Sequence, residues 1–321
     1  MPTWGQILQE LQAEQQKTNQ LPYDTIRRRY VAALHGYTKR NTILYATKWT
    51  QSAEAKPEAI SITEEDVQGL MEVIYELKTP ELDLILHSPG GSAEATEAIV
   101  TYLRSKFNDI RAIIPHAAMS AATMLACSAN RIVMGKHSFL GPIDPQFILQ
   151  TPLGIQVVPA QAILDQFRKA QSECKDPQML NSWLPILSQY GPALLVQCNN
   201  AIELSQELVT TWLHNYMFGG LSPNPSKSIA DKLSNHGDFK SHSRHISLSA
   251  AQGMGLLVTP LENDHRFQEH VLSVFHVTMH TFSATPAVKI IENHLGRAFI
   301  KMQQQILIPQ PVAPRPPTPK P

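Results

Sequence analysis

Between residues 41 and 134 short apolar runs alternate with helix-like patterns, and this alternation limits the possible folds more than any other feature. Apolar runs of strand length occur at Asn41–Thr47, Leu82–His87, Ile110–Pro115 and Arg131–Met134. Helical spacing lies between them, at residues 63–77, 93–107 and 120–128. Strands that alternate with helices form largely parallel sheets through right-handed crossovers. The sequence therefore predicts an α/β fold.

Helical patterns also flank this region. We expect an N-terminal helical extension over residues 1–40, broken near Pro22, and a main domain over residues 41–282. Within the main domain, helices are expected at 159–172, 185–214 and 262–282, with a helix–strand pair at 247–258. A C-terminal helical segment over 283–307 and a Pro-rich disordered tail over 308–321 complete the predicted organisation.

Composition excludes several classes of protein. The 321 residues are 43% hydrophobic, which is enough for a sizeable core, and the formal net charge of +0 gives no reason to expect nucleic acid or an anionic membrane as partner. Three cysteines without a CxxC pair are typical of a reduced, intracellular chain. With no signal-peptide layout and no apolar run of about 18 residues, we predict a cytoplasmic protein without membrane insertion.

Two stretches of small residues carry the chemistry. Ser88-Pro89-Gly90-Gly91 follows a predicted strand, where glycines allow the backbone N–H groups to come close to a ligand. Ser120 lies in a second stretch, at a predicted change from strand to helix. Taken alone, a serine there is best interpreted as a helix N-cap. Together, the two stretches supply a nucleophile and amide donors for a tetrahedral oxyanion, as acyl transfer requires.

These motifs resemble a known family. Leu84–Gly91, Ala118–Thr123, Ala129–Val133 and Leu140–Gln146 resemble, in order and spacing, the ClpP/crotonase superfamily. Within it, residues 40 to 280 look like the serine dehydrogenase proteinase family, relatives of signal peptide peptidase A.

The resemblance implies a spiral of β-β-α units, here with added N- and C-terminal helices. It also implies Ser120 as nucleophile, and backbone N–H groups of Gly90, Gly91 and Ala121 as the oxyanion hole. No cofactor is expected. The implied partners are a protein or peptide substrate and further copies of the chain in a homo-oligomer.

The general base is the open question of the site. The histidine of the ClpP triad would fall at residues 143–145, where Asp144 stands instead. Relatives of signal peptide peptidase A use a Ser-Lys dyad, and by position Lys175 or, second, Lys169 would supply the lysine. Both also fit surface lysines, because neither has an apolar context that would lower its pKa. Tyr190 and a histidine are further candidates.

His236, His242 and His245 form the densest histidine cluster. Their spacing does not match a metal-binding motif, so no metal is expected, and a structural, interface or catalytic role stays open. His116, four residues before Ser120, fits a packed strand-end histidine. The function predicted is a serine endopeptidase. The alternatives are a non-catalytic ClpP-like scaffold that binds peptides, or a crotonase-type enzyme acting on coenzyme A thioesters.

Overall fold

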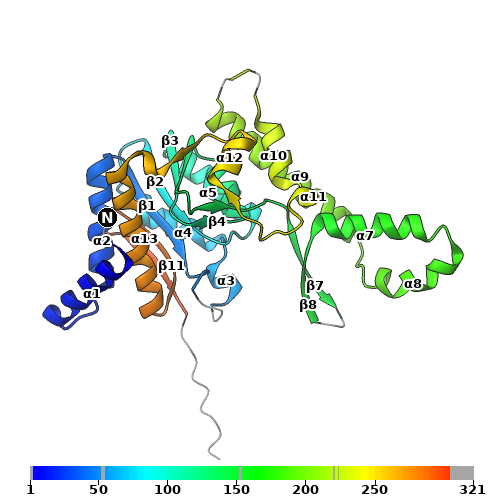
Figure 1. Ribbon diagram of the computed structural model, residues 1–321, viewed down its shortest axis with the longest axis horizontal. Coiled ribbons are helices and arrows are strands. Elements are labelled where there is room, and N and C mark those ends of the chain that lie inside the picture. The colour runs from blue at the N-terminus through cyan, green and yellow to red at the C-terminus, as the bar shows by residue number, and fades with distance from the viewer. Residues whose placement is uncertain (1–2, 52–54, 152–153, 220, 223, 304–321) are drawn as a thin grey trace, which may run out of the picture.

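A seven-stranded mixed sheet forms the centre of the molecule (Figure 1). The computed structural model describes residues 3–51, 55–151, 154–219, 221–222 and 224–303. The strand order is β10-β5-β3-β2-β1-β11-β12, and the strands from β10 to β1 run parallel. Their bounds are Asn41–Thr47 (β1), Glu81–His87 (β2), Asp109–Ile114 (β3), Arg131–Met134 (β5) and Val258–Pro260 (β10). The α/β class and the four strands expected between residues 41 and 134 are therefore confirmed.

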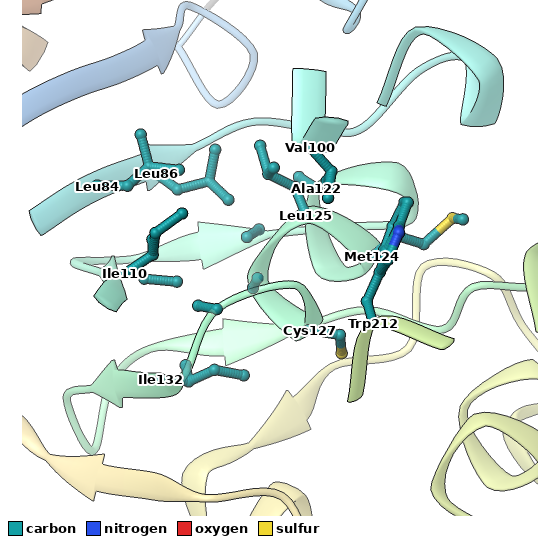
Figure 2. Packing of buried hydrophobic residues seen from close by; sticks show 14 of the residues in the cluster. Leu84, Leu86, Val100, Ile110, Ala122, Met124, Leu125, Cys127, Ile132 and Trp212 are labelled. Carbon is teal, nitrogen blue, oxygen red and sulfur yellow. The ribbon is translucent and has the colours of Figure 1, made fainter. Parts of the chain in front are cut away.

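Helices cover both faces of this sheet. On one face lie α4 (Glu65–Ile74), α5 (Ala93–Arg104) and α6 (Ala121–Cys127). Their apolar side chains meet Leu84 and Leu86 of β2 and Trp212 in the larger core cluster, which Figure 2 shows from close by. Ile85, which points the other way, belongs to a second cluster formed with helices on the opposite face.

The predicted N-terminal helices are confirmed as α1 (Trp4–Thr18) and α2 (Tyr23–Thr38), which lie with α13 (His265–Ala284) on the opposite face. α2 contacts β1 and α13 directly. Arg27, fully buried, donates to the Glu292 carboxylate at 2.7 Å and so links α2 to the C-terminal part of the chain. Helices α1 and α2 thus form part of the helical layer that covers one face of the central sheet.

The helical segment expected over 283–307 is wrong. Residues Ala287–Asn293 (β11) and Ala298–Met302 (β12) form two strands, and β11 pairs antiparallel with β1. All seven residues of β11 are buried, including Lys289, which binds Asp66 at 2.6 Å. Partners from distant parts of the chain therefore fix this segment as strand, and the sheet extends past the expected boundary at residue 282. The predicted tail over 308–321 lies outside the described residues.

An arm extends from the body of the molecule (Figure 1). It contains the hairpin β7 (Gln146–Thr151) and β8 (Gly154–Pro159), then α7 (Ala160–Glu173) and α8 (Pro177–Leu187), and α9 (Leu194–Trp212) joins it to the body. The predicted helix over 159–172 corresponds to α7. The one over 185–214 is divided by a break at residues 188–193, where Ala193 has a positive φ of 63°. The hairpin was not predicted.

Shorter elements complete the body. They are α3 (Pro57–Ile60), a π-turn (Leu213–Met217), α10 (Ser226–Ser234), α11 (His236–Phe239), α12 (Leu248–Met254) and a 3-10 turn (Leu261–Asn263). A small three-stranded sheet, β4 (Ala117–Ala118), β6 (Phe139–Leu140) and β9 (Ile246–Ser247), lies beside α6. Among the described helices, none combines the length and apolar character needed to cross a bilayer.

Candidate active site

Two turns from successive strand–helix units meet at the carboxyl ends of β2 and β3. Gly90, after β2, has a positive φ of 100°. A Cβ at this position would lie 2.8 Å from Cβ of Ser120 and 2.9 Å from the amide nitrogen of Ala121. Only glycine allows both the conformation and so close an approach. The Gly90 turn and the Ser120 turn, 30 residues apart in the sequence, are therefore in direct contact.

The backbone of Ile62 packs against Gly91. Its neighbours bind the backbone of Ile62, because Ile62 N–H donates to the Gly90 carbonyl at 2.7 Å and Ser92 N–H donates to the Ile62 carbonyl at 3.0 Å. A Cβ on Gly91 would lie 2.3 Å from the Ile62 carbonyl oxygen. The glycine pair is thus fixed between two backbone segments.

Ser120 occupies a strained backbone conformation. Its φ of 53° and ψ of −123° lie outside the regions that non-glycine residues usually adopt. It precedes α6 in the N-cap position, yet its hydroxyl makes no capping hydrogen bond. The N-cap interpretation of this serine is therefore wrong. A strained serine at a sharp strand-to-helix turn is the arrangement that exposes the nucleophile in many hydrolases.

The Ser120 side chain is half-buried and lines a cleft of about 290 Å³. Gly91, Ser92 and Ala121 line the same cleft, together with apolar side chains that include Met124, Ile143 and Leu204. A cleft that combines apolar side chains with polar groups is typical of a ligand-binding site.

Two backbone N–H groups at this cleft are unused. Among the described residues, neither the amide of Gly91 nor that of Ala121 has a hydrogen-bond acceptor. The Gly90 amide differs, because it donates to the Ser88 hydroxyl at 3.2 Å. Of the three amides expected at an oxyanion hole, Gly91 and Ala121 are therefore free to bind an anion.

The lysines predicted as base lie on the arm. Lys169 belongs to α7, its side chain is 66% exposed, and its ammonium lies 3.8 Å from the Glu173 carboxylate. Lys175 is exposed in the turn between α7 and α8. Neither lines the Ser120 cleft. The burial that would make a lysine a base near neutral pH is absent at both.

Tyr190 also belongs to the arm. Its hydroxyl donates to Gln166 at 2.6 Å, and burial raises the pKa of its phenol. A higher pKa leaves less phenolate at neutral pH. This side chain therefore does not have the properties of a base for Ser120 in the structure described.

Two of the clustered histidines do come together. His242 and His236 each place Nδ1 against the Asp144 carboxylate, at 2.7 Å and 2.9 Å. His245 instead stacks on Phe139 with ring centroids 3.6 Å apart. No group of three or more histidine, cysteine or carboxylate side chains in the described parts of the chain is arranged as metal ligands. Sequence reasoning found the three histidines but missed that Asp144 joins two of them, because 92 residues separate Asp144 from His236.

His116 lies on the opposite face of the sheet from the cleft. Its ring packs between Phe139, Phe275 and His87, and burial lowers its pKa. The interpretation of His116 as a packed strand-end histidine is confirmed.

The chain belongs to the family of ClpP-like SDH-type serine proteinases, whose model matches residues 60–260, more than half of the sequence. Similar curated proteins include the uncharacterized protein MJ1495 of Methanocaldococcus jannaschii, 31% identical over 167 residues. That match covers 48% of this chain and 54% of the relative. The uncharacterized protein MJ0137 of the same organism is 30% identical over 171 residues, covering 48% and 55%. The chain thus spans about half the length of these relatives.

Solved structures to which the chain is similar include a Ser→Ala mutant of the 1510-N membrane-bound stomatin-specific protease. The match has 14% identity and a TM-score of 0.38, and covers 64% of this chain and 77% of that one. A Lys→Ala mutant of the same protease in complex with a substrate peptide matches with 15% identity and a TM-score of 0.39, covering 64% and 73%.

Proposed function

We propose that this protein is a serine endopeptidase that hydrolyses protein or peptide bonds with Ser120 as nucleophile. The observation that carries the proposal is the strained, uncapped Ser120, which faces a cleft next to two unused amides. Strain at a non-glycine residue costs of the order of 1–3 kcal/mol and persists where function requires the geometry. Membership of a serine proteinase family supports the same activity.

In this mechanism the Ser120 Oγ attacks the carbonyl carbon of the scissile bond. The carbonyl oxygen becomes an oxyanion, which the N–H groups of Gly91 and Ala121 bind, while Gly90 holds the turn in place. Collapse of this intermediate breaks the C–N bond and leaves an acyl-Ser120 ester, which water then hydrolyses. The apolar side chains around the cleft favour peptides with an apolar residue next to the scissile bond.

A fluorophosphonate probe tests the nucleophile, because it reacts covalently only with an activated serine. We expect one labelled residue, Ser120, and no labelling of Ser120→Ala. Ser92 provides a matched control, since it lines the same cleft but caps α5 by accepting from the Ala95 N–H at 3.0 Å. Ser92→Ala should retain the label. Labelling that survives Ser120→Ala, or is absent from the wild type, contradicts the proposal and favours a non-catalytic peptide-binding scaffold.

The Ser-Lys dyad stays a prediction with its own test. If a lysine of the arm is the base, Lys175→Ala or Lys169→Ala should lose peptide cleavage as completely as Ser120→Ala. The exposed positions of both lysines lead us to expect nearly full activity in each variant.

We also propose that the chain forms a homo-oligomer through the arm. The hairpin exposes Ile148, Ile155 and Val157 by 74%, 70% and 62%, and α8 exposes Leu184 by 51%. Apolar side chains exposed in this way on a projecting arm mark an interaction surface, here for a second copy. Sedimentation of the wild type against Ile148→Lys with Ile155→Lys tests this, and an unchanged sedimentation coefficient would contradict it.

A further inference from the structure

A single carboxylate gives the Ser120 cleft its charge. Among the described residues that line this cleft, Glu94 is the only one with an acidic or basic side chain. The others carry apolar, hydroxyl or amide groups, or no side chain beyond a hydrogen or a methyl group. The wall of the cleft therefore offers a substrate one negative charge and no positive charge.

Glu94 lies close to the reacting groups. It belongs to the first turn of α5, three residues after Gly91, and three residues of chain span at most about 11 Å. Gly91 carries one of the two unused amides, and its neighbour Gly90 contacts the Ser120 turn, since a Cβ there would lie 2.8 Å from Ser120 Cβ. Residues of an extended peptide advance by about 3.3 Å each. A peptide side chain within about three residues of the scissile bond can therefore reach the Glu94 carboxylate.

The Glu94 carboxylate is oriented but not neutralised. The Ser92 hydroxyl, which also lines the cleft, donates to Glu94 Oε2 at 2.8 Å. In the parts of the chain that the structure describes, no lysine, arginine or histidine forms an ion pair with Glu94. Glu72, an exposed glutamate of α4, differs because Arg297 binds it at 3.0 Å. The negative charge of Glu94 is thus available to a cation that enters the cleft.

Together, the walls of the cleft define which peptides fit it. Met124, Ile143 and Leu204 offer an apolar surface, and Glu94 offers the charge. A peptide that carries an apolar and a basic side chain satisfies both. An acidic side chain at the same position is repelled by Glu94 and finds no cation on the cleft wall. Such an arrangement discriminates between substrates by attraction and by repulsion at once.

We propose that Glu94 makes the protein selective for peptides with a lysine or arginine within about three residues of the scissile bond, and that it rejects acidic residues there. This inference rests on the proposed function, because it names the substrates of the same Ser120 site. Glu94 takes no part in bond making or breaking. Its charge therefore changes KM more than kcat.

The experiment uses peptides that differ only in charge. An apolar parent peptide receives lysine, glutamine or glutamate in turn at each of the three positions on either side of the scissile bond. For the wild type we expect kcat/KM to be about two- to fivefold higher for lysine than for glutamine at one or two adjacent positions, and lower by a similar factor for glutamate, as for an exposed ion pair. The preference should shrink at about 1 M salt, which screens exposed charges.

Variants of α5 assign the preference to one carboxylate. Glu94→Gln should bring the lysine-to-glutamate ratio of kcat/KM close to one, and Glu94→Lys should invert it. Glu97→Lys is the matched control, because Glu97 is exposed one turn further along α5 and does not line the cleft. It should keep the preference of the wild type. The ratio for two peptides cleaved by the same variant does not depend on how much of that variant is folded.

Three results overturn this inference and leave the proposed function intact: a wild type that cleaves all charged variants of the peptide equally, a preference that survives Glu94→Lys, and an equal inversion by Glu97→Lys. If Glu94→Lys does not fold, Glu94→Gln and the salt dependence of the wild type decide. If the wild type cleaves none of the peptides, two fluorophosphonates that differ only in a terminal ammonium or carboxylate replace them. Faster labelling of Ser120 by the ammonium probe, lost in Glu94→Gln, supports the inference, and equal rates overturn it. Absence of labelling by either probe overturns both the inference and the proposed function.

Discussion

Gly90→Ala tests the contact between the two turns on which the whole site depends. The new Cβ would lie 2.6 Å from the Met119 carbonyl oxygen, 2.8 Å from Ser120 Cβ and 2.9 Å from the Ala121 nitrogen. Two of these atoms are backbone, so the clash is relieved only if the turns separate. The positive φ of 100° costs an alanine about 1–2 kcal/mol. Forcing atoms into a packed region costs about 1–3 kcal/mol more.

Gly154 of the same chain provides a control in which a new Cβ meets no packed neighbour, so that the cost of the steric clash is absent. Gly154 has an almost identical φ of 106°, but a Cβ there would have no heavy atom within 4 Å. We therefore expect Gly154→Ala to lower the free energy of unfolding by about 1–2 kcal/mol. Gly90→Ala should lower it by about 2–5 kcal/mol, the sum of the two costs.

Urea unfolding of both variants measures this difference, and fluorophosphonate labelling measures its effect on the site. Gly90→Ala should lose labelling of Ser120 even under conditions where it is fully folded, because the separated turns no longer align the amides with the nucleophile. Gly154→Ala should label normally. Equal stability losses in the two variants, or normal labelling of Gly90→Ala, would refute the close contact between the Gly90 turn and the Ser120 turn.

Three further predictions follow from single residues. Ser120→Gly should raise the free energy of unfolding by about 1 kcal/mol over Ser120→Ala, because glycine relieves the strained φ of 53°, and urea unfolding of the two variants checks this. Burial lowers the pKa of His87 to about 3. Because the unfolded chain binds the proton first, stability should fall as the pH drops from about 6.5 toward 3, by up to about 1.4 kcal/mol per pH unit. His87→Gln should flatten this slope in unfolding measurements at pH 7, 6 and 5. Lys289→Met should cost about 3–5 kcal/mol, because it leaves the buried Asp66 carboxylate without its cation, and the double variant with Asp66→Asn should recover part of the loss.

Local patterns were sufficient for much of the fold. The strands from β1 to β5 that build the parallel part of the sheet, and the helices between them, follow from apolar periodicity and from breaks such as Ser88-Pro89-Gly90. The prediction of a helical segment over 283–307 was wrong because the residues that bind this segment lie far away in the sequence. Lys289 and Glu292 in β11 are unusual residues for a buried strand, and their ion pairs with Asp66 and Arg27 become visible only in three dimensions.

The proposed nucleophile Ser120 and the glycines that accompany it could be predicted from the sequence, because a turn of small residues after a strand is recognisable from four or five consecutive positions. Whether Ser120 caps a helix or faces a cleft was decided by tertiary contacts, since the approach of Gly90 and the packing of Gly141 against Met119 set the strained turn.

The hydrogen-bond partners of Asp144 show most clearly what the sequence alone could not predict. The sequence determined that an aspartate stands where the ClpP triad would have a histidine, and that histidines cluster about a hundred residues later. Only the small sheet, which places β9 beside β6, brings His242 to Asp144. The physical reason is that backbone propensity acts over a few neighbouring residues, whereas a buried carboxylate and the imidazoles that bind it come together only once the chain is packed.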